Sequence, residues 1–175
     1  ELMLQKSFEK ITIKQICDKT GVIRATFYNY FEDKYAALSY IIYLDTVETA
    51  LPYIEKRQFL QAVKAMLDNF VENREFYQIA FRITGQNSFE DLFEENVQQL
   101  FTEMFRRYGR PEKLGTMSEE ELAGYFGNSL CYTVNHWLCR SRGMDSETFL
   151  KQYGSVVTSS IFDFLDMPLG GGNGA

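Results

Sequence analysis

The chain has 175 residues, which suits one domain or a small domain joined to a medium-sized one. It carries 24 Asp and Glu against 18 Lys and Arg, so its formal net charge is −6. This acidic balance excludes a general coater of nucleic acids, which needs a basic surface, although it leaves room for a local basic patch. Apolar residues make up 45% of the chain, enough for a sizeable core, and aromatic residues are abundant at 15%.

Cysteine is sparse and follows no metal-binding or disulfide pattern. Cys17, Cys131 and Cys139 form no CxxC motif, so neither a disulfide framework nor a zinc ribbon is expected. Together with the lack of a visible signal peptide, this usage favours the reducing cytoplasm.

The chain is predicted to be all-α, because no long run alternates apolar and polar residues with strand period and no Asn-Gly or Asp-Gly pair joins two such runs. Two capping-box patterns, Thr12 with Gln15 and Ser118 with Glu121, mark helix starts. The expected helices cover residues 1–8, 12–19, 23–30, 34–50, 57–72, 74–84, 88–108, 118–142 and 146–166.

Prolines mark expected helix boundaries, since proline cannot continue a helix interior. Pro52, Pro111 and Pro168 each follow a long helical pattern, and Asp145 can cap the last helix. The Gly-rich end at residues 168–175 is expected to be a flexible tail.

The segment 11–34 has the spacing of a helix-turn-helix. Its first helix turns Ile13 and Ile16 inward, and Gly21 stands where the tight turn needs a left-handed residue. A short second helix follows, in the position of a helix that enters a major groove. Many helical hairpins share this spacing, so it indicates DNA binding only together with particular side chains.

The residue pattern of this segment resembles that of the TetR family of bacterial repressors. The residues that carry the resemblance are Thr12, Ile13, Ile16, Gly21, Val22, Thr26, Phe27, Tyr28, Asn29, Tyr30, Phe31 and Lys34. One position departs from the family pattern: Ile23 stands where the family usually has Ser or a similar cap at the start of the recognition helix.

The resemblance implies an N-terminal three-helix helix-turn-helix domain at residues 1–46. A larger helical effector-binding and dimerisation domain would follow at residues 47–167, giving about nine helices in all. It also implies a homodimer that binds a palindromic double-stranded DNA operator. Such a protein is a transcriptional regulator, typically a repressor, controlled by a small-molecule or protein effector.

Charge and residue type in the first forty residues agree with this resemblance. They hold six basic and five acidic side chains, whereas the rest of the chain holds 12 basic and 19 acidic ones. Phosphate contacts are expected from Thr12, Lys14, Tyr28, Asn29, Tyr30 and Lys34. Base contacts are expected from Arg24, Ala25 and Thr26, because Arg offers a fork for guanine and methyl groups can meet thymine. Without the motif, the two lysines would be solvated charges and the two tyrosines packing aromatics, as Phe27 and Phe31 are expected to be.

Two uncharged runs, at residues 122–139 and 152–162, predict helices buried on more than one side. The first run reaches the length of a membrane span, but its Gly, Asn, Ser, Thr and His residues argue against one, and no membrane contact is expected. We expect the two helices to form a four-helix bundle with a second copy, the alternative being a well-packed monomer core. Candidate dimer residues are Leu130, Val134, Trp137, Tyr153, Val156, Ser160 and Phe164.

The aromatic-rich middle of the chain is expected to be mostly core. A pocket for an effector is implied there by the family resemblance. Its candidate residues are Tyr77, Phe81, Phe101, Asn128, Tyr132 and His136. The last three fall at i, i+4 and i+8, hence on one helix face.

A second resemblance is narrower. The runs Phe76-Tyr77 to Phe89 and Trp137-Leu138 to Met144 are similar to a TetR subgroup that includes regulators of dihydroxyacetone kinase operons.

Enzyme motifs are absent from the sequence. His136 is the only histidine, and no GxSxG, HExxH, GxxxxGK[ST] or GxGxxG occurs. No catalytic residue, metal site or cofactor is therefore expected. The alternative to a DNA-binding regulator is a helical adaptor that acts through protein partners without binding DNA.

Overall fold

The structure is a computed structural model that describes residues 1–85, 87–110, 116–140, 144–159 and 163–164. Every regular element within these ranges is helical, which confirms the all-α prediction. The elements in chain order are η1 (Leu2–Leu4), η2 (Phe8–Lys10), α1 (Ile13–Thr20), α2 (Arg24–Tyr30), α3 (Lys34–Tyr43), η3 (Leu44–Glu48), α4 (Thr49–Glu55), α5 (Phe59–Glu72), α6 (Arg74–Ala80), α7 (Phe89–Tyr108), α9 (Glu119–Arg140) and α10 (Ser146–Thr158).

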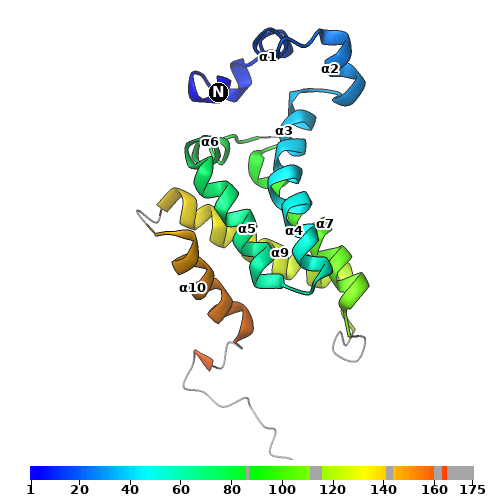
Figure 1. Cartoon of the computed structure of the whole chain (residues 1–175), viewed down its shortest axis with the longest axis vertical. Helices are drawn as coiled ribbons and strands as arrows, with labels where there is room; N and C mark the ends of the chain where they lie inside the picture. Colours follow the sequence, from blue (N-terminus) through cyan, green and yellow to red (C-terminus); the bar gives the residue numbers. More distant parts are fainter. Residues whose placement is uncertain (86, 111–115, 141–143, 160–162, 165–175) are drawn as a thin grey trace, which may run out of the picture.

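Figure 1 shows two parts of unequal size. The elements from η1 to α2 form a small head at one end, and α4 to α10 form the body below it. Helix α3 leads from the head into the body, and η1 also contacts α6. Within the described residues, no helix combines the length and the apolar character needed to cross a membrane.

Most of the expected helices are present, with three differences at their ends. The first expected helix, 1–8, is instead two short 3-10 turns, η1 and η2. Helix α6 ends at Ala80 rather than at residue 84, and α10 ends at Thr158 where Ser159 adopts extended backbone. The expected tail at 168–175, Pro111 and Pro168 lie outside the described residues.

The predicted helix boundary at Pro52 is wrong, because the helix continues through it to Glu55. Helices α3 and α4 are joined without a break by η3, a π-helical segment, so residues 34–55 form one rod. The α-helical pattern restarts at Thr49, which places Pro52 in the first turn after η3. Because proline lacks a backbone N–H, it destabilises a helix least in the first turn. The change from π-helical to α-helical hydrogen bonding also leaves space for the proline ring there.

Close packing of α7 on α9 forms the centre of the body. A Cβ atom added at Gly127 of α9 would lie 3.1 Å from the Cγ of Gln98 on α7, so glycine allows this approach. The long uncharged run of the sequence is therefore the helix that α7 covers along one side.

Helix α10 is held against α5 and the end of α9. The Ser146 hydroxyl donates to the Asp68 carboxylate of α5 at 2.8 Å. The Trp137 ring of α9 packs on Phe149 at 4.8 Å, and its N–H donates to the Met144 carbonyl at 3.0 Å. These contacts fix both ends of the connection between α9 and α10.

Two glycines with open space around them can show whether backbone conformation alone sets the effect of replacing a glycine. Gly21 has a φ of +72°, and nothing lies within 4 Å of an added Cβ at Gly21 or at Gly124. Gly21→Ala should lower the free energy of unfolding by about 1–2 kcal/mol, because only the left-handed conformation is penalised. Gly124→Ala, in the middle of α9, should raise it by about 0.5–1 kcal/mol.

The measurement is thermal unfolding of the three proteins at one concentration. A loss of stability in both variants would mean that space, and not backbone conformation, decides the effect at these sites.

Candidate nucleic-acid interface

The head is built on a helix with a complete capping box. The Thr12 hydroxyl accepts from the Gln15 N–H at 3.3 Å, and the Gln15 side-chain oxygen accepts from the Thr12 N–H at 3.1 Å. This confirms the sequence prediction for the start of α1. The helix ends at Gly21, whose left-handed backbone turns the chain into α2. Thr12 and Lys14 are both exposed on the first turn.

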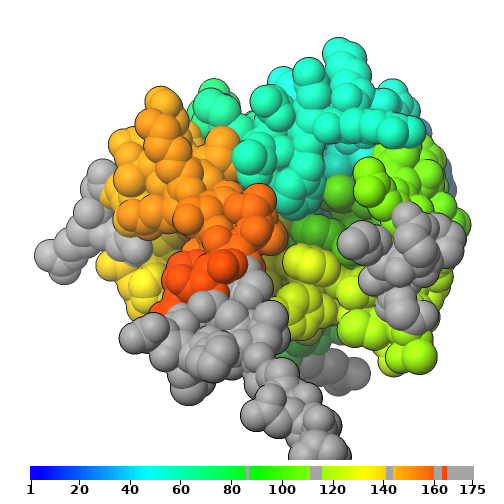
Figure 2. Space-filling model, turned by 90° about the horizontal axis from the view of Figure 1, so that it is seen from below, coloured from blue at the N-terminus to red at the C-terminus, as the bar shows by residue number. Residues whose placement is uncertain are grey.

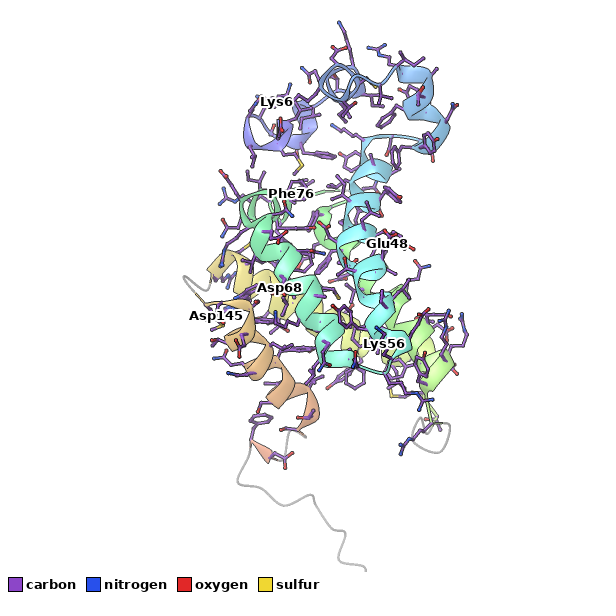
Figure 3. All side chains as sticks on the ribbon, in the orientation of Figure 1. Lys6, Glu48, Lys56, Asp68, Phe76 and Asp145 are labelled. Carbon is purple, nitrogen blue, oxygen red and sulfur yellow. The ribbon has the colours of Figure 1, made fainter. Side chains whose placement is uncertain are left out.

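Helix α2 contacts α1, and Phe27 is its buried residue. Phe27 is buried, with ring contacts to Tyr28 at 5.7 Å and to Phe31 at 5.4 Å. The other expected DNA-contacting residues of this helix are half-buried at Thr26 and exposed at Arg24, Ala25, Tyr28, Asn29 and Tyr30. Figures 1 and 3 show α2 at the outer edge of the head, away from the body, with its side chains projecting outward. One face of α2 is thus free to meet a partner.

Ile23 is a further exposed residue at the start of α2, and its residue type alone predicts no DNA contact. It occupies the N-cap position, makes no side-chain capping bond and is 70% exposed. In the sequence, the one sign of this exposed apolar side chain is that Ile23 departs from the family pattern.

Lys34 makes internal hydrogen bonds that the sequence did not predict. Its ammonium group donates to the carbonyl oxygens of Phe8 at 2.8 Å, Glu9 at 3.0 Å and Ile11 at 3.1 Å. The same group sits over the Phe8 ring, 4.8 Å from its centroid. An ammonium has three N–H donors, so none is left for a phosphate in this geometry. These three bonds tie the start of α3 to the segment before α1.

Comparisons with known proteins place this architecture in a family. The sequence model for the N-terminal region of bacterial regulatory proteins of the TetR family matches residues 1–40. A model described as a transcriptional regulator C-terminal region, of the TetR type, matches residues 57–159, more than half of the chain. The chain belongs to the TetR family of transcriptional regulators.

A solved structure agrees with this assignment. A protein described as a TetR-family transcriptional regulator from Syntrophomonas wolfei strain Goettingen superposes with a TM-score of 0.64 and 17% sequence identity. The match covers 89% of this chain and 86% of that one, so nearly the whole fold is shared. A search of curated proteins finds no match.

In this TetR-family regulator, the residues expected to line one effector pocket are separated. Tyr77, Phe81 and Phe101 pack into the body, where Tyr77 contacts Phe70 at 4.6 Å and Phe81 contacts Phe89 at 4.8 Å. The other three residues expected to line the pocket are exposed on α9: Asn128, Tyr132 and His136. The Asn128 side-chain oxygen accepts from the Gln98 amide of α7 at 2.6 Å, whereas Leu130 and Val134 of α9 are buried in the core. The six residues therefore do not form a common pocket.

The Tyr77 hydroxyl is the polar feature of this aromatic core. It donates to the Asp45 carboxylate in η3. Burial, followed by the nearby Asp45 carboxylate, raises the pKa of Tyr77 well above its usual range. Tyr77 therefore stays neutral and acts as a hydrogen-bond donor that ties α6 to the rod.

The expected dimer residues are divided in a similar way. Leu130, Val134, Trp137 and Tyr153 are buried within the single chain, so they are core residues and not a free face. Val156 and Phe164 are exposed, and Ser160 lies outside the described residues. The face that α9 leaves open carries Tyr125, Ser129, Tyr132 and His136, and both tyrosines are 69% exposed. We call these four residues the α9 stripe.

Replacing Lys34 tests its internal role. Lys34→Met should lower the free energy of unfolding by about 1–3 kcal/mol, because it removes a cation from three carbonyl oxygens. Lys14→Met, at an exposed position of α1, should change it by less than about 0.5 kcal/mol. Chemical denaturation monitored by circular dichroism measures both. Equal stabilities of the two variants would contradict the structural assignment of Lys34.

Proposed function

We propose that this TetR-family regulator binds a palindromic DNA operator as a homodimer, with α2 of each copy in the major groove. The observation that carries the proposal is the free face of α2, held on a helix whose opposite side is fixed by Phe27. Operator half-sites would lie about 34–36 Å apart, or a multiple of this distance, as two-fold symmetry requires.

Base reading is assigned to the first turn of α2. Arg24 offers a bidentate fork to guanine, and Ala25 and Thr26 offer methyl groups to thymine. The exposed methyl groups of Ile23 add a second apolar contact of the same kind. Phosphate contacts are assigned to Thr12, Lys14, Tyr28, Asn29 and Tyr30, all of which are exposed.

Lys34 is assigned a positioning role instead of a phosphate contact. Its three bonds to carbonyl oxygens connect α3 to the head, so it affects DNA through the orientation of α1 and α2.

The dimer contact is assigned to the α9 stripe, together with Val156 of α10. Large aromatic side chains this exposed are typical of a surface that a partner covers. A second copy of the same chain can cover the stripe by a self-complementary contact across a two-fold axis.

Regulation is assigned to an effector that binds the body and changes operator affinity by binding its two states differently. We further propose repression as the direction of control, the cytoplasm as the location and binding without catalysis as the activity. We place the boundary between the head and the body between residues 46 and 47, within η3. We also propose, on sequence similarity alone, that the chain is related to regulators of dihydroxyacetone kinase operons.

Selection of bound fragments from genomic DNA, followed by binding measurements on the selected operator, tests the reading head. Arg24→Ala should weaken operator binding by about ten- to a hundredfold, with little effect on random DNA, because it removes a base contact worth about 1–3 kcal/mol. Lys14→Gln should weaken both DNAs alike and reduce the salt dependence by about one charge.

The wild-type protein at low salt is the reference. If it selects no sequence, the proposed function fails. If Arg24→Ala weakens operator and random DNA equally, the assignment of base reading to Arg24 fails.

Sedimentation tests the dimer. The wild-type protein at micromolar concentration should sediment at twice the chain mass of 20.4 kDa. Tyr132→Glu should shift it to the monomer, because two added charges would face each other near the two-fold axis. Tyr30→Glu, the same change on the head, should leave the dimer intact. A monomeric wild type, or a dimeric Tyr132→Glu variant, would contradict this interface.

A further inference from the structure

A pocket opens at the end of the body opposite the head. It consists of two adjoining cavities of about 480 Å³ and about 240 Å³ that share Met104, Tyr108 and Arg110. Figure 2 views this end and shows the turn between α4 and α5, the end of α7 and the beginning of α9 next to one another. In Figure 3, the label of Lys56 marks the same turn. Pockets of this size accommodate small organic ligands.

The walls of the pocket are apolar. Ile54 lines it from the end of α4, Phe59 from the start of α5, Met104 and Phe105 from α7, and Phe126 from α9. The aromatic rings are fixed by mutual contacts, with Phe105 at 5.8 Å from Phe126. The apolar part of a ligand would therefore pack against aromatic rings whose positions are already fixed.

Two cationic side chains, Arg57 and Arg110, also line the pocket. Neither has an ion-pair partner among the described residues, whereas Arg106 and Arg107 of α7 are both paired with Glu103. The pocket thus combines apolar walls with guanidinium groups whose charge is not neutralised within the described part of the chain.

The backbone at Arg57 indicates that its side chain is retained at a cost. Arg57 has a φ of 58°, in the left-handed region that favours glycine. A side chain in this conformation costs about 1–2 kcal/mol relative to glycine. Its guanidinium lies over the Tyr108 ring at 5.2 Å, which holds the charge at the pocket. Strain of this kind gathers at ligand sites, where a particular side chain is needed in a particular place.

We propose that this pocket is the effector site and takes a small molecule with an apolar body and one carboxylate. The apolar part lies against Phe59, Met104 and Phe126, and the carboxylate is bound by Arg57 and Arg110, since guanidinium binds carboxylate with two parallel hydrogen bonds. This inference rests on the proposed function for its regulatory meaning.

The pocket is placed to act on the head through the rod. Ile54 lies in α4, which is continuous with α3, and Arg57 follows directly after α4. A ligand bound between Arg57 and the end of α7 changes the contacts at the C-terminal end of the rod. The other end of the rod carries the reading head.

Calorimetry with two probes, decanoate and 4-phenylbutyrate, tests the site, and 1-decanol serves as the uncharged analogue. At least one carboxylate should saturate the wild-type protein and bind at least tenfold tighter than 1-decanol. Arg57→Gly should weaken that binding by tenfold or more while leaving the melting temperature equal or higher, because glycine relieves the left-handed strain. Lys56→Gln, the matched loss of charge one residue away, should leave binding unchanged.

The proposal is overturned if neither carboxylate saturates the protein, if 1-decanol binds as tightly, or if Arg57→Gly binds like the wild type. Binding to the selected operator is measured separately, and the saturating carboxylate should change it several-fold. Operator binding without carboxylate binding refutes this inference alone. Carboxylate binding without any operator binding refutes the proposed function and leaves the site standing.

Discussion

The ammonium group of Lys34 is the contact on which the placement of the head depends. Its own backbone begins α3, and its three hydrogen bonds reach carbonyl oxygens that precede α1. Hydrogen bonds from a charged donor are stronger than neutral ones, and the Phe8 ring beneath the cation excludes water from one side. Helix α2 packs against α1, and the head is also held by the η1 contact to α6 and by Phe8, whose ring packs against Tyr35 of α3 at 5.1 Å.

The sequence predicted the head better than the body, for a physical reason. Thr12 with Gln15 and the left-handed Gly21 act within one turn of their own positions, so local chemistry determines them. Periodicity also separated the faces of α9, but it could not say which face the rest of the same chain would cover. Leu130 and Val134 therefore changed from expected interface to core, whereas the neighbouring Tyr132 proved to be exposed.

Other features could not be predicted because they depend on distant partners. The side chain of Lys34 meets carbonyl oxygens more than twenty residues away. The pocket at Arg57 brings together the α4–α5 turn, α7 and α9, which are far apart in the chain. A local signal for its strained residue was also lacking, since arginine in the left-handed region has no sequence pattern. The passage of the helix through Pro52 required η3, which propensities do not reveal.

The rod has a fixed point along its length. The Tyr77 hydroxyl binds the Asp45 carboxylate, and the Asn69 amide donates to the Asp45 carbonyl at 3.1 Å and to the Thr49 hydroxyl at 2.9 Å. These bonds hold η3 to α5 and α6, so a tilt of the rod about η3 would move its two ends in opposite directions. At 1.5 Å per residue, Lys34 stands about 18 Å from Thr46, so a tilt of about 5° moves the head end by about 1.5 Å. In a two-fold dimer the opposing arms change the distance between heads by about 3 Å, enough to take base-edge hydrogen bonds out of range on at least one half-site.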